Sequence, residues 1–374
     1  MTENASTSST VTMTYPKAGS GSEMLAEQGA ALINRCLAFN SGSGLSTITI
    51  NRSIENEGAT PFVSADRHGA TLGYTVEPDN AVGLVPLLAI DCTFEKWDVR
   101  DAIALAAYQT KEANKSAQIV LTEQIYAAAY GPQSPMGRPF YCADAHTDEI
   151  VEFRRRGYGL NGAILTATGV KDHAAFCTEV EELLKESPVG SSDPAPVATY
   201  LGGEGRISAP SAGFAHVALA FEAKVSIPLR NVLKQCLDLV GREAGVSAFQ
   251  TKGLLGVYAG ASSDAVGTLE GALTKTLMSA PSAEIIRRAK TLAKAEAMFA
   301  MDSGSKGLAA AMTASFAESG SFANSSAVAQ AYDSISDKDI TSALSTILKS
   351  NPALAAVGDI GVVPYQGTFA AHFK

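Results

Sequence analysis

Apolar and polar positions follow a helical period most clearly within residues 94–142. We expect one helix at residues 96–111 and a second at 114–130. The second helix has an apolar stripe made of Leu121, Ile125, Ala128 and Ala129. Prolines and glycines follow at once and cannot continue a helix, so both segments should lead into a rigid, irregular connection.

Alternating patterns predict strands elsewhere in the chain. Residues 10–15 alternate threonines with larger apolar side chains, which is typical of a half-buried strand. Two further strands, 61–65 and 71–76, should form a hairpin in which Gly69 takes a positive φ. Additional strands are expected at 162–169, 214–221 and 253–261.

The remaining periodic segments predict helices. They are residues 23–39, 46–57, 79–91, 146–156, 172–186, 226–240, 264–278, 282–301, 307–318, 325–332 and 337–349. In the segment 282–301 the expected buried stripe is Ile285, Ala289, Leu292 and Phe299.

The chain divides near its middle into two similar parts. Residues 187–199 carry three prolines without a periodic pattern, as extended linkers do. An ungapped shift of 190 residues places Glu149-Ile150 on Asp339-Ile340, and a break and an apolar strand follow in both copies. We therefore expect an α+β fold of two duplicated α/β sandwich halves, each a mostly antiparallel sheet covered by helices. The predicted parts are a flexible leader at 1–9, the halves 10–186 and 200–374, and the linker.

Composition narrows the class of protein. The 374 residues are 46% hydrophobic and 18% charged, so the chain has ample material for globular cores. A formal net charge of -9 disfavours nucleic acid as a partner. The only basic triplet, Arg154 to Arg156, is accompanied by no aromatic stacking platform and no second basic cluster, and we interpret it as a solvated helix face.

Cysteine usage and hydropathy point to a reducing compartment and to no membrane span. The five cysteines are scattered without CxxC spacing, so they predict neither a zinc ribbon nor a disulfide framework. No apolar run reaches the ~20 residues that span a bilayer. The first ten residues lack the arginines of a transit peptide and the apolar core of a secretory signal.

Seven short motifs in a fixed order suggest a family. They are Lys17-Ala-Gly-Ser20, Phe94-x-x-Trp97-x-Val99, Ala127-Ala-Ala-Tyr130, Pro135-x-Gly137, Tyr141-Cys142-x-Asp144, Tyr200-x-Gly-Gly-Glu204-x-Arg206, and Val246-Ser-Ala-Phe249 with Gly253-Leu-x-Gly256-x-Tyr258. Together they resemble the pitrilysin- or insulinase-type zinc peptidase family. Within it, they resemble the inactive core subunits of the mitochondrial cytochrome bc1 complex.

The resemblance implies that the zinc chemistry of active members is lost. Active members hold zinc through His-x-x-Glu-His on the first long helix. Alignment of Ala38-Phe39 with the family pattern puts these positions at Leu32, Arg35 and Cys36. A further ligand, a glutamate, would fall within residues 103–108, which contain no acid. We therefore expect no catalytic residue, no metal and no cofactor.

Other catalytic and binding motifs are equally absent from the sequence. The five histidines never pair at i, i+3 or i, i+4. No Gly-x-Ser-x-Gly elbow stands between a strand and a helix. The segment Gly202 to Gly205 lacks the Lys-Ser or Lys-Thr of a phosphate loop, so a turn explains it.

The resemblance also implies the setting of the protein. It implies an inert structural subunit on the matrix side of the mitochondrial inner membrane, where the partners are other subunits, including a homologous core subunit. Contact with the membrane would then be only through these partners. Two alternatives stay open: an inert relative in another organellar complex, mitochondrial or plastid, and a processing-peptidase subunit.

Two departures from the family pattern bear on these alternatives. The glycine-rich loop associated with presequence recognition in α-type processing subunits is missing before Val246, which argues against that role. The family's first half also normally opens with more strand than residues 10–15 supply. We therefore expect this strand to be an exposed edge, covered by the leader or by another subunit.

Overall fold

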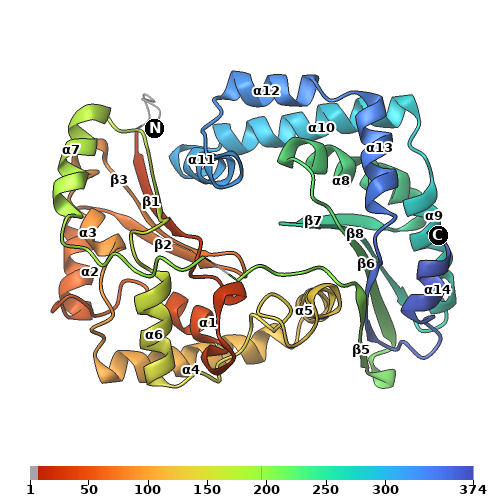
Figure 1. Ribbon diagram of the computed structural model, residues 1–374, viewed down its shortest axis with the longest axis horizontal. Helices are drawn as coiled ribbons and strands as arrows, with labels where there is room; N and C mark the ends of the chain where they lie inside the picture. The colour runs from red at the N-terminus through yellow and green to blue at the C-terminus, as the bar shows by residue number, and fades with distance from the viewer. Residues whose placement is uncertain (1–6, 195, 374) are drawn as a thin grey trace. The chain divides into compact units, whose positions relative to one another are not determined.

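The computed structural model describes residues 7–194 and 196–373, and the described chain forms two compact units (Figure 1). The first unit contains the described residues up to Lys111, those within 140–197, and Phe299–Asn324. The second unit contains Glu112–Pro139, those from Ala198 to Met298, and Ser325–Lys374 as far as residue 373.

The first unit is built on a four-stranded antiparallel sheet in the order β2-β3-β1-β4. Its strands are β1 (Ser9–Tyr15), β2 (Thr60–Ala65), β3 (Ala70–Val76) and β4 (Ile164–Thr168). Val11, Met13 and Tyr15 point from β1 into the main core of this unit. Alternation along the strand therefore puts the intervening threonines on the opposite face.

Helices cover both faces of this sheet. They are α1 (Ala30–Cys36), α2 (Thr47–Asn56), α3 (Val85–Leu88), α4 (Lys96–Ala113), α6 (Thr147–Gly157), α7 (His173–Leu183) and α11 (Ser305–Ser319). Buried side chains of α2, α3 and α7 belong to the main core, and Figure 1 shows these helices on one side of the sheet. Helix α11 packs on β1 and β4.

The second unit is built on a five-stranded sheet in the order β5-β9-β6-β8-β7. Its strands are β5 (Gly203–Ser208), β6 (Phe214–Glu222), β7 (Ser247–Thr251), β8 (Leu254–Ser262) and β9 (Ala353–Gly358). Only the β5–β9 pair is parallel. Both sheets and their helical cover confirm the predicted fold class.

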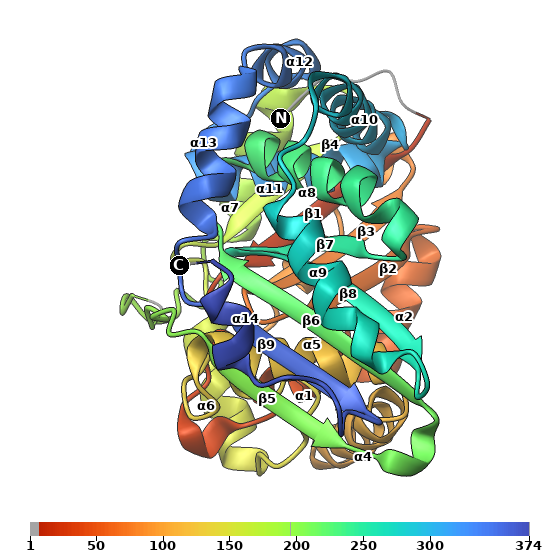
Figure 2. The same cartoon turned by 90° about the vertical axis from the view of Figure 1, so that its right-hand side faces the viewer.

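Helices also cover the second sheet. They are α5 (Ala117–Tyr130), α8 (Ile227–Gly241), α9 (Leu269–Met278), α10 (Ala283–Asp302), α12 (Ser325–Asp333), α13 (Asp337–Ile347) and α14 (Gln366–Ala371). Figure 2 shows α9 and α14 in front of β8 and β9. Helix α5 packs on β9, β5 and β6.

The two units repeat one topology. The order β2-β3-β1-β4 corresponds to β7-β8-β6-β9. Helices α6 and α13 begin and end 190 residues apart, which is the shift found in the sequence. In each sheet an edge-strand phenylalanine lies over a glycine of the neighbouring strand: a Cβ on Gly73 would meet the Phe62 ring at 2.6 Å, and one on Gly256 would meet the Phe249 ring at 2.7 Å. This shared phenylalanine–glycine contact supports the duplication of one ancestral unit.

Each unit takes one helix from the opposite half of the sequence. Helix α5 precedes the midpoint yet packs on the second sheet, and α11 follows it yet packs on the first. The segment 187–199 is therefore where the main chain passes between sheets, but not every element changes unit there. Of the predicted leader, residues 1–6 lie outside the described part, and β1 already begins at Ser9.

The midpoint segment is anchored at both ends by backbone hydrogen bonds. Leu160 N donates to Pro188 O at 2.9 Å, and Asn161 N donates to Val189 O at 2.8 Å. Beyond the prolines, Leu201 N donates to Ala129 O at 2.8 Å. These hydrogen bonds hold the chain on both sides of the prolines.

Two predicted helices are much shorter in the structure. The prediction for residues 23–39 is wrong before Ala30, because Gly29 has a φ of 92° and only short 3-10 turns precede it. A Cβ at Gly29 would also lie 2.5 Å from Cys142 O, so only glycine fits there. The prediction for residues 79–91 is wrong except at Val85–Leu88.

Strand β1 is not an edge, so the prediction for residues 10–15 is wrong on that point. It pairs with β3 on one side and β4 on the other. Thr10 and Thr12 are buried at 0% and 4% exposure, because α11 covers the face that they share. The sequence pattern could not distinguish a threonine under a helix from one in water.

Two finer expectations are also corrected. Gly69 has no positive φ. A glycine is required at this position because a Cβ there would approach Tyr15 O to 2.8 Å. The turn is stabilised by the Asp66 carboxylate, which accepts hydrogen bonds from His68 N and Gly69 N. In α10 the buried stripe is Ile286, Ala289 and Ala293, whereas Leu292 and Phe299 are exposed.

Candidate functional site

Helix α1 carries all three positions that the family resemblance assigns to the lost zinc site. Its N-terminus is held by the buried carboxylate of Glu23, which accepts from Gly29 N at 3.2 Å and from Ala31 N at 2.8 Å. A carboxylate at a helix N-terminus is favoured by the exposed N–H groups there. Asn34 then ties the helix to α6 by donating to Ile150 O at 3.2 Å.

The Arg35 guanidinium joins α1 to α4. It donates a hydrogen bond to the Gln109 side-chain oxygen. Its central carbon lies 5.7 Å from the centroid of the buried Phe140 ring, within the range of a cation–π contact. A fixed cation thus lies beside Cys36, where a metal ion would be repelled.

The other two positions offer no better ligand. Leu32 is fully buried and belongs to the apolar core. The Cys36 sulfur lies 3.8 Å from the same Gln109 oxygen. Burial raises the pKa of the Cys36 thiol, and the nearby Arg35 charge only partly offsets this. A protonated thiol is a poor metal ligand, since metals bind the thiolate.

Gln109 is the contact residue of this region that sequence reasoning missed. It lies 74 residues after Arg35 and 73 after Cys36, one residue beyond the window 103–108 in which the family's glutamate was sought. Within that window Leu105 and Tyr108 are exposed, whereas Gln109 points toward α1. The inward face of α4, with Ala102 and Ala106 buried, was the signal that could have located it.

The arginine triplet is not a solvated face, so that interpretation is wrong for two of its three members. The Arg154 side chain is buried, and its guanidinium lies 4.1 Å from the Tyr158 ring centroid. Arg156 pairs with the buried carboxylate of Glu27 at 2.5 Å. Only Arg155 is exposed. Two members of the triplet therefore make contacts within the first unit, and the triplet forms no basic surface patch.

The histidines are dispersed in the structure as in the sequence. His216 Nδ1 lies 2.7 Å from the Tyr258 hydroxyl, and His372 Nε2 lies 3.1 Å from a Glu270 oxygen. Within residues 7–194 and 196–373, no group of three or more His, Cys, Asp or Glu side chains is placed to hold a metal ion. The same part of the chain has no helix long and apolar enough to cross a membrane.

Comparison with known proteins agrees with the motifs. Residues 1–144 match the family described as Insulinase (Peptidase family M16). The match lies in the N-terminal part of the chain, and the resemblance to the insulinase-type family is confirmed there.

More particular likenesses extend over nearly the whole chain. Mitochondrial-processing peptidase subunit alpha of Solanum tuberosum is 25% identical over 411 residues, covering 96% of this chain and 80% of the relative. Cytochrome b-c1 complex subunit 2, mitochondrial, of Homo sapiens is 24% identical over 402 residues, covering 94% and 85%. The relatives therefore include both a processing-peptidase subunit and a respiratory-complex subunit.

A solved structure extends the agreement to the fold. A chain of Complex III2 from Candida albicans with Inz-5 bound superposes with a TM-score of 0.81, over 99% of this chain and 95% of that chain. Their sequences are 16% identical, so this likeness concerns the fold.

Proposed function

We propose that this chain is a catalytically inactive core subunit of a mitochondrial cytochrome bc1 complex, corresponding to its subunit 2. The observation that carries the proposal is the similarity to cytochrome b-c1 complex subunit 2 over 94% of the chain. Its partners are then the other subunits, including a homologous core subunit. Its place is the matrix side of the inner membrane, which it contacts only through those partners.

The contacts around α1 support the absence of peptidase activity. A hydrolytic zinc site needs three protein ligands and an open position for water. Leu32, Arg35 and Cys36 place an apolar side chain, a cation and a half-buried thiol at the proposed positions, and Gln109 supplies only a neutral amide. We propose that Arg35 replaces the metal as the link between α1 and α4.

A processing-peptidase subunit is the second candidate, because subunit alpha of that enzyme is also a relative. The connection between α8 and β7 argues against it. Only the 3-10 turn Arg242–Ala244 and a few flanking residues join the two elements. The short connection leaves no room for the glycine-rich loop that the family resemblance associates with presequence recognition.

Purification from native cells separates the two candidates. The tagged full-length chain would be isolated from gently solubilised mitochondria, and the preparation examined by mass spectrometry and visible absorption. We expect b-type and c-type haem absorption to co-purify with the chain. Recovery of a haem-free pair of M16 chains that cleaves presequence peptides would replace the core-subunit proposal with the peptidase one.

Metal analysis tests the proposed loss of the site. We expect the native chain to hold no stoichiometric zinc, because the Arg35 cation repels it. The variant Leu32→His/Arg35→Glu/Cys36→His/Gln109→Glu should bind about one zinc ion, with a matched control that keeps Gln109 binding it more weakly. Stoichiometric zinc in the native chain, with chelator-sensitive peptidase activity, would refute inactivity.

A further inference from the structure

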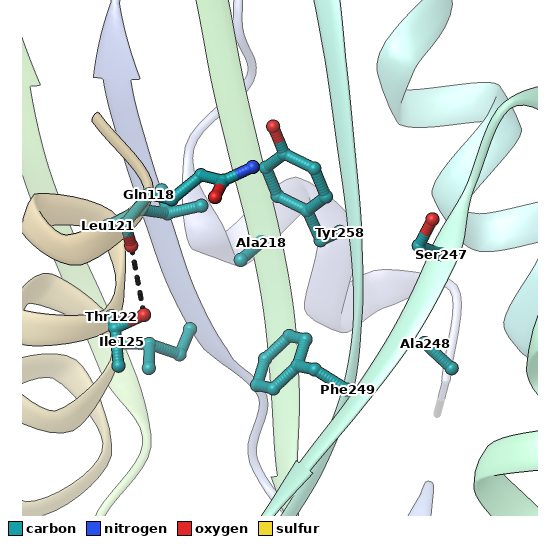
Figure 3. A pocket seen from close by; sticks show the side chains of 9 residues that line it. All are labelled: Gln118, Leu121, Thr122, Ile125, Ala218, Ser247, Ala248, Phe249 and Tyr258. Carbon is teal, nitrogen blue, oxygen red and sulfur yellow. Dashed lines mark hydrogen bonds between the residues drawn. The ribbon is translucent and has the colours of Figure 1, made fainter. Parts of the chain in front are cut away.

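A partly open pocket of about 180 Å³ lies in the second unit, between α5 and the strands β6, β7 and β8 (Figure 3). Its lining residues are Gln118, Leu121, Thr122 and Ile125 of α5, Ala218 of β6, Ser247, Ala248 and Phe249 of β7, and Tyr258 of β8. Figure 3 shows α5 on one side and the Phe249 and Tyr258 rings on the other.

In the first unit a lysine side chain lies at the corresponding place. There, Phe62 of β2 corresponds to Phe249, and the ammonium of Lys306 lies 4.0 Å from the Phe62 ring centroid. Lys306 is the second residue of α11, as Gln118 is the second residue of α5. A long cationic side chain thus covers the ring in one copy, whereas a shorter neutral one leaves a pocket in the other.

Hydrogen-bonded hydroxyl groups also lie at this place in the first unit. Thr10, which corresponds to Ala218 in the paired register, bonds to Thr75 at 3.0 Å and to Ser305 of α11 at 2.8 Å. Ala218 has no group that could reach α5 in this way. The pocket therefore follows from small or neutral residues at positions that are larger or polar in the other copy.

The walls of the pocket are held by contacts that do not depend on an occupant. The Tyr258 hydroxyl lies 2.7 Å from His216 Nδ1, which fixes the tyrosine ring. Phe249 lies against Gly256, which has no side chain to displace it. Leu121, Ile125 and Ala218 are buried in the cluster that α5 forms with the sheet. The pocket is therefore preformed.

Its size and chemistry restrict the occupant. None of the lining residues is charged, and the polar groups are the Gln118 amide and the hydroxyls of Thr122, Ser247 and Tyr258. Pockets for whole cofactors are about 300–1,000 Å³, whereas an apolar cavity of about 150 Å³ holds benzene. The volume of about 180 Å³ thus fits one leucine- or phenylalanine-sized group.

We propose that this pocket binds an uncharged aromatic or branched aliphatic group, with Gln118 at its polar rim. The group can be a free small molecule or a side chain presented by a polypeptide, because both have the same chemistry. The assignment does not depend on the proposed role in the cytochrome bc1 complex.

Ligand-observed NMR on the full-length chain tests the proposal with three probes. Toluene represents the free molecule, N-acetyl-phenylalanine amide represents a side chain with its peptide groups, and butylammonium tests whether charge is accepted. We expect the first or the second to bind with a dissociation constant of about 1 mM or below. Binding of the amide alone would identify a polypeptide side chain as the source. Binding of butylammonium alone, or of none of the three, would overturn the proposal.

Two variants locate the binding. Gln118→Lys should cover Phe249 as Lys306 covers Phe62, and Thr122→Phe should fill the pocket from α5. Each should weaken probe binding at least about tenfold. Thr178→Phe is the matched control, because Thr122 and Thr178 are both exposed helical threonines whose hydroxyls donate to the carbonyl four residues earlier. Unchanged binding in both pocket variants, or equal loss in the control, would place the probes elsewhere.

Discussion

Helices α11 and α5 occupy corresponding places in the two units, yet they pack on faces of opposite chemistry. Under α11, hydroxyls pair: Thr10 with Ser305 at 2.8 Å, and Thr166 with Thr313 at 2.9 Å. Under α5 the strands present Ala218, Ala220, Ala353 and Ala355, and Leu121 and Ile125 pack against them. The same geometry is thus stabilised by directional hydrogen bonds in one copy and by apolar burial in the other.

The difference shows that helix position in a duplicated fold is set by sheet geometry and not by one kind of contact. A hydroxyl pair forms only where both hydroxyls lie at hydrogen-bond distance, so the helix and the sheet must pack closely there. Apolar packing is non-directional and tolerates a gap at its border, which is where the pocket lies. Substitutions under the two helices should therefore change the free energy of unfolding by different amounts, and their effects should differ in additivity.

The largest effect is expected from Ile125→Ala in α5. Ile125 is 1% exposed, and its truncation removes apolar contacts and leaves a cavity. The expected loss in the free energy of unfolding is about 2–5 kcal/mol, measured by denaturant titration. Thr122→Ala, one turn away and exposed, is the control. A loss below that of Thr122→Ala would show that apolar packing does not hold α5.

A smaller and non-additive effect is expected under α11. Thr313 donates to Ala309 O, so the buried Thr166 hydroxyl is the donor to Thr313. Thr313→Val leaves that hydroxyl without an acceptor and should cost about 1–2 kcal/mol. The double variant Thr166→Val/Thr313→Val should cost less than the sum of the single variants, as measured by a double-mutant cycle. Simple additivity would contradict a coupled hydroxyl pair.

A stabilising change is expected at Thr12 on the same face. Its hydroxyl is buried without a hydrogen-bond partner. Thr12→Val removes that group at nearly constant shape and should raise the free energy of unfolding by up to about 1 kcal/mol. Thr10→Val, which breaks the bonds to Thr75 and Ser305, should destabilise instead. Destabilisation of equal size in both variants would mean that the Thr12 hydroxyl has an unseen partner.

The smallest effect concerns pH and the second unit. Burial lowers the pKa of His216, so its neutral form, whose Nδ1 lies 2.7 Å from the Tyr258 hydroxyl, is favoured in the folded chain. The unfolded chain then takes up a proton first as the pH falls. This contribution to stability is present above the ordinary pKa of about 6.5 and is lost as the pH falls through the lower folded value. An NMR titration should find His216 below 6.5, and Tyr258→Phe should raise its pKa. Titration at or above 6.5 in the native chain would refute this.

Much of the fold was predictable because local signals agreed with the final packing. The second helix of the central stretch begins at Ala117, after the N-cap Ser116, and ends at Tyr130 before the proline-rich connection. The hairpin of β2 and β3, and the shift of 190 residues between α6 and α13, also follow from pattern and turn residues. These features depend on contacts close in sequence or on repetition.

The candidate site was predictable only in part. The family register placed Leu32, Arg35 and Cys36 on one helix, and that assignment stays a prediction. Gln109 was missed because its contact to Arg35 joins residues far apart in the chain. Arg154 was misjudged in part for the same reason: its guanidinium lies over the Phe94 ring, which is distant in the sequence, as well as over the nearby Tyr158 ring.

The sequence by itself determined the class of fold, the duplication and the absence of the His-x-x-Glu-His motif, because periodicity, repetition and residue identity are local properties. Only the tertiary structure decided that β1 is internal, that α5 and α11 each pack on the sheet of the opposite half, and that one copy has a pocket where the other has Lys306. Threonine suits a solvated face and a hydroxyl-paired one equally well, and a helical stripe does not specify which sheet it will cover. Long-range packing makes those choices.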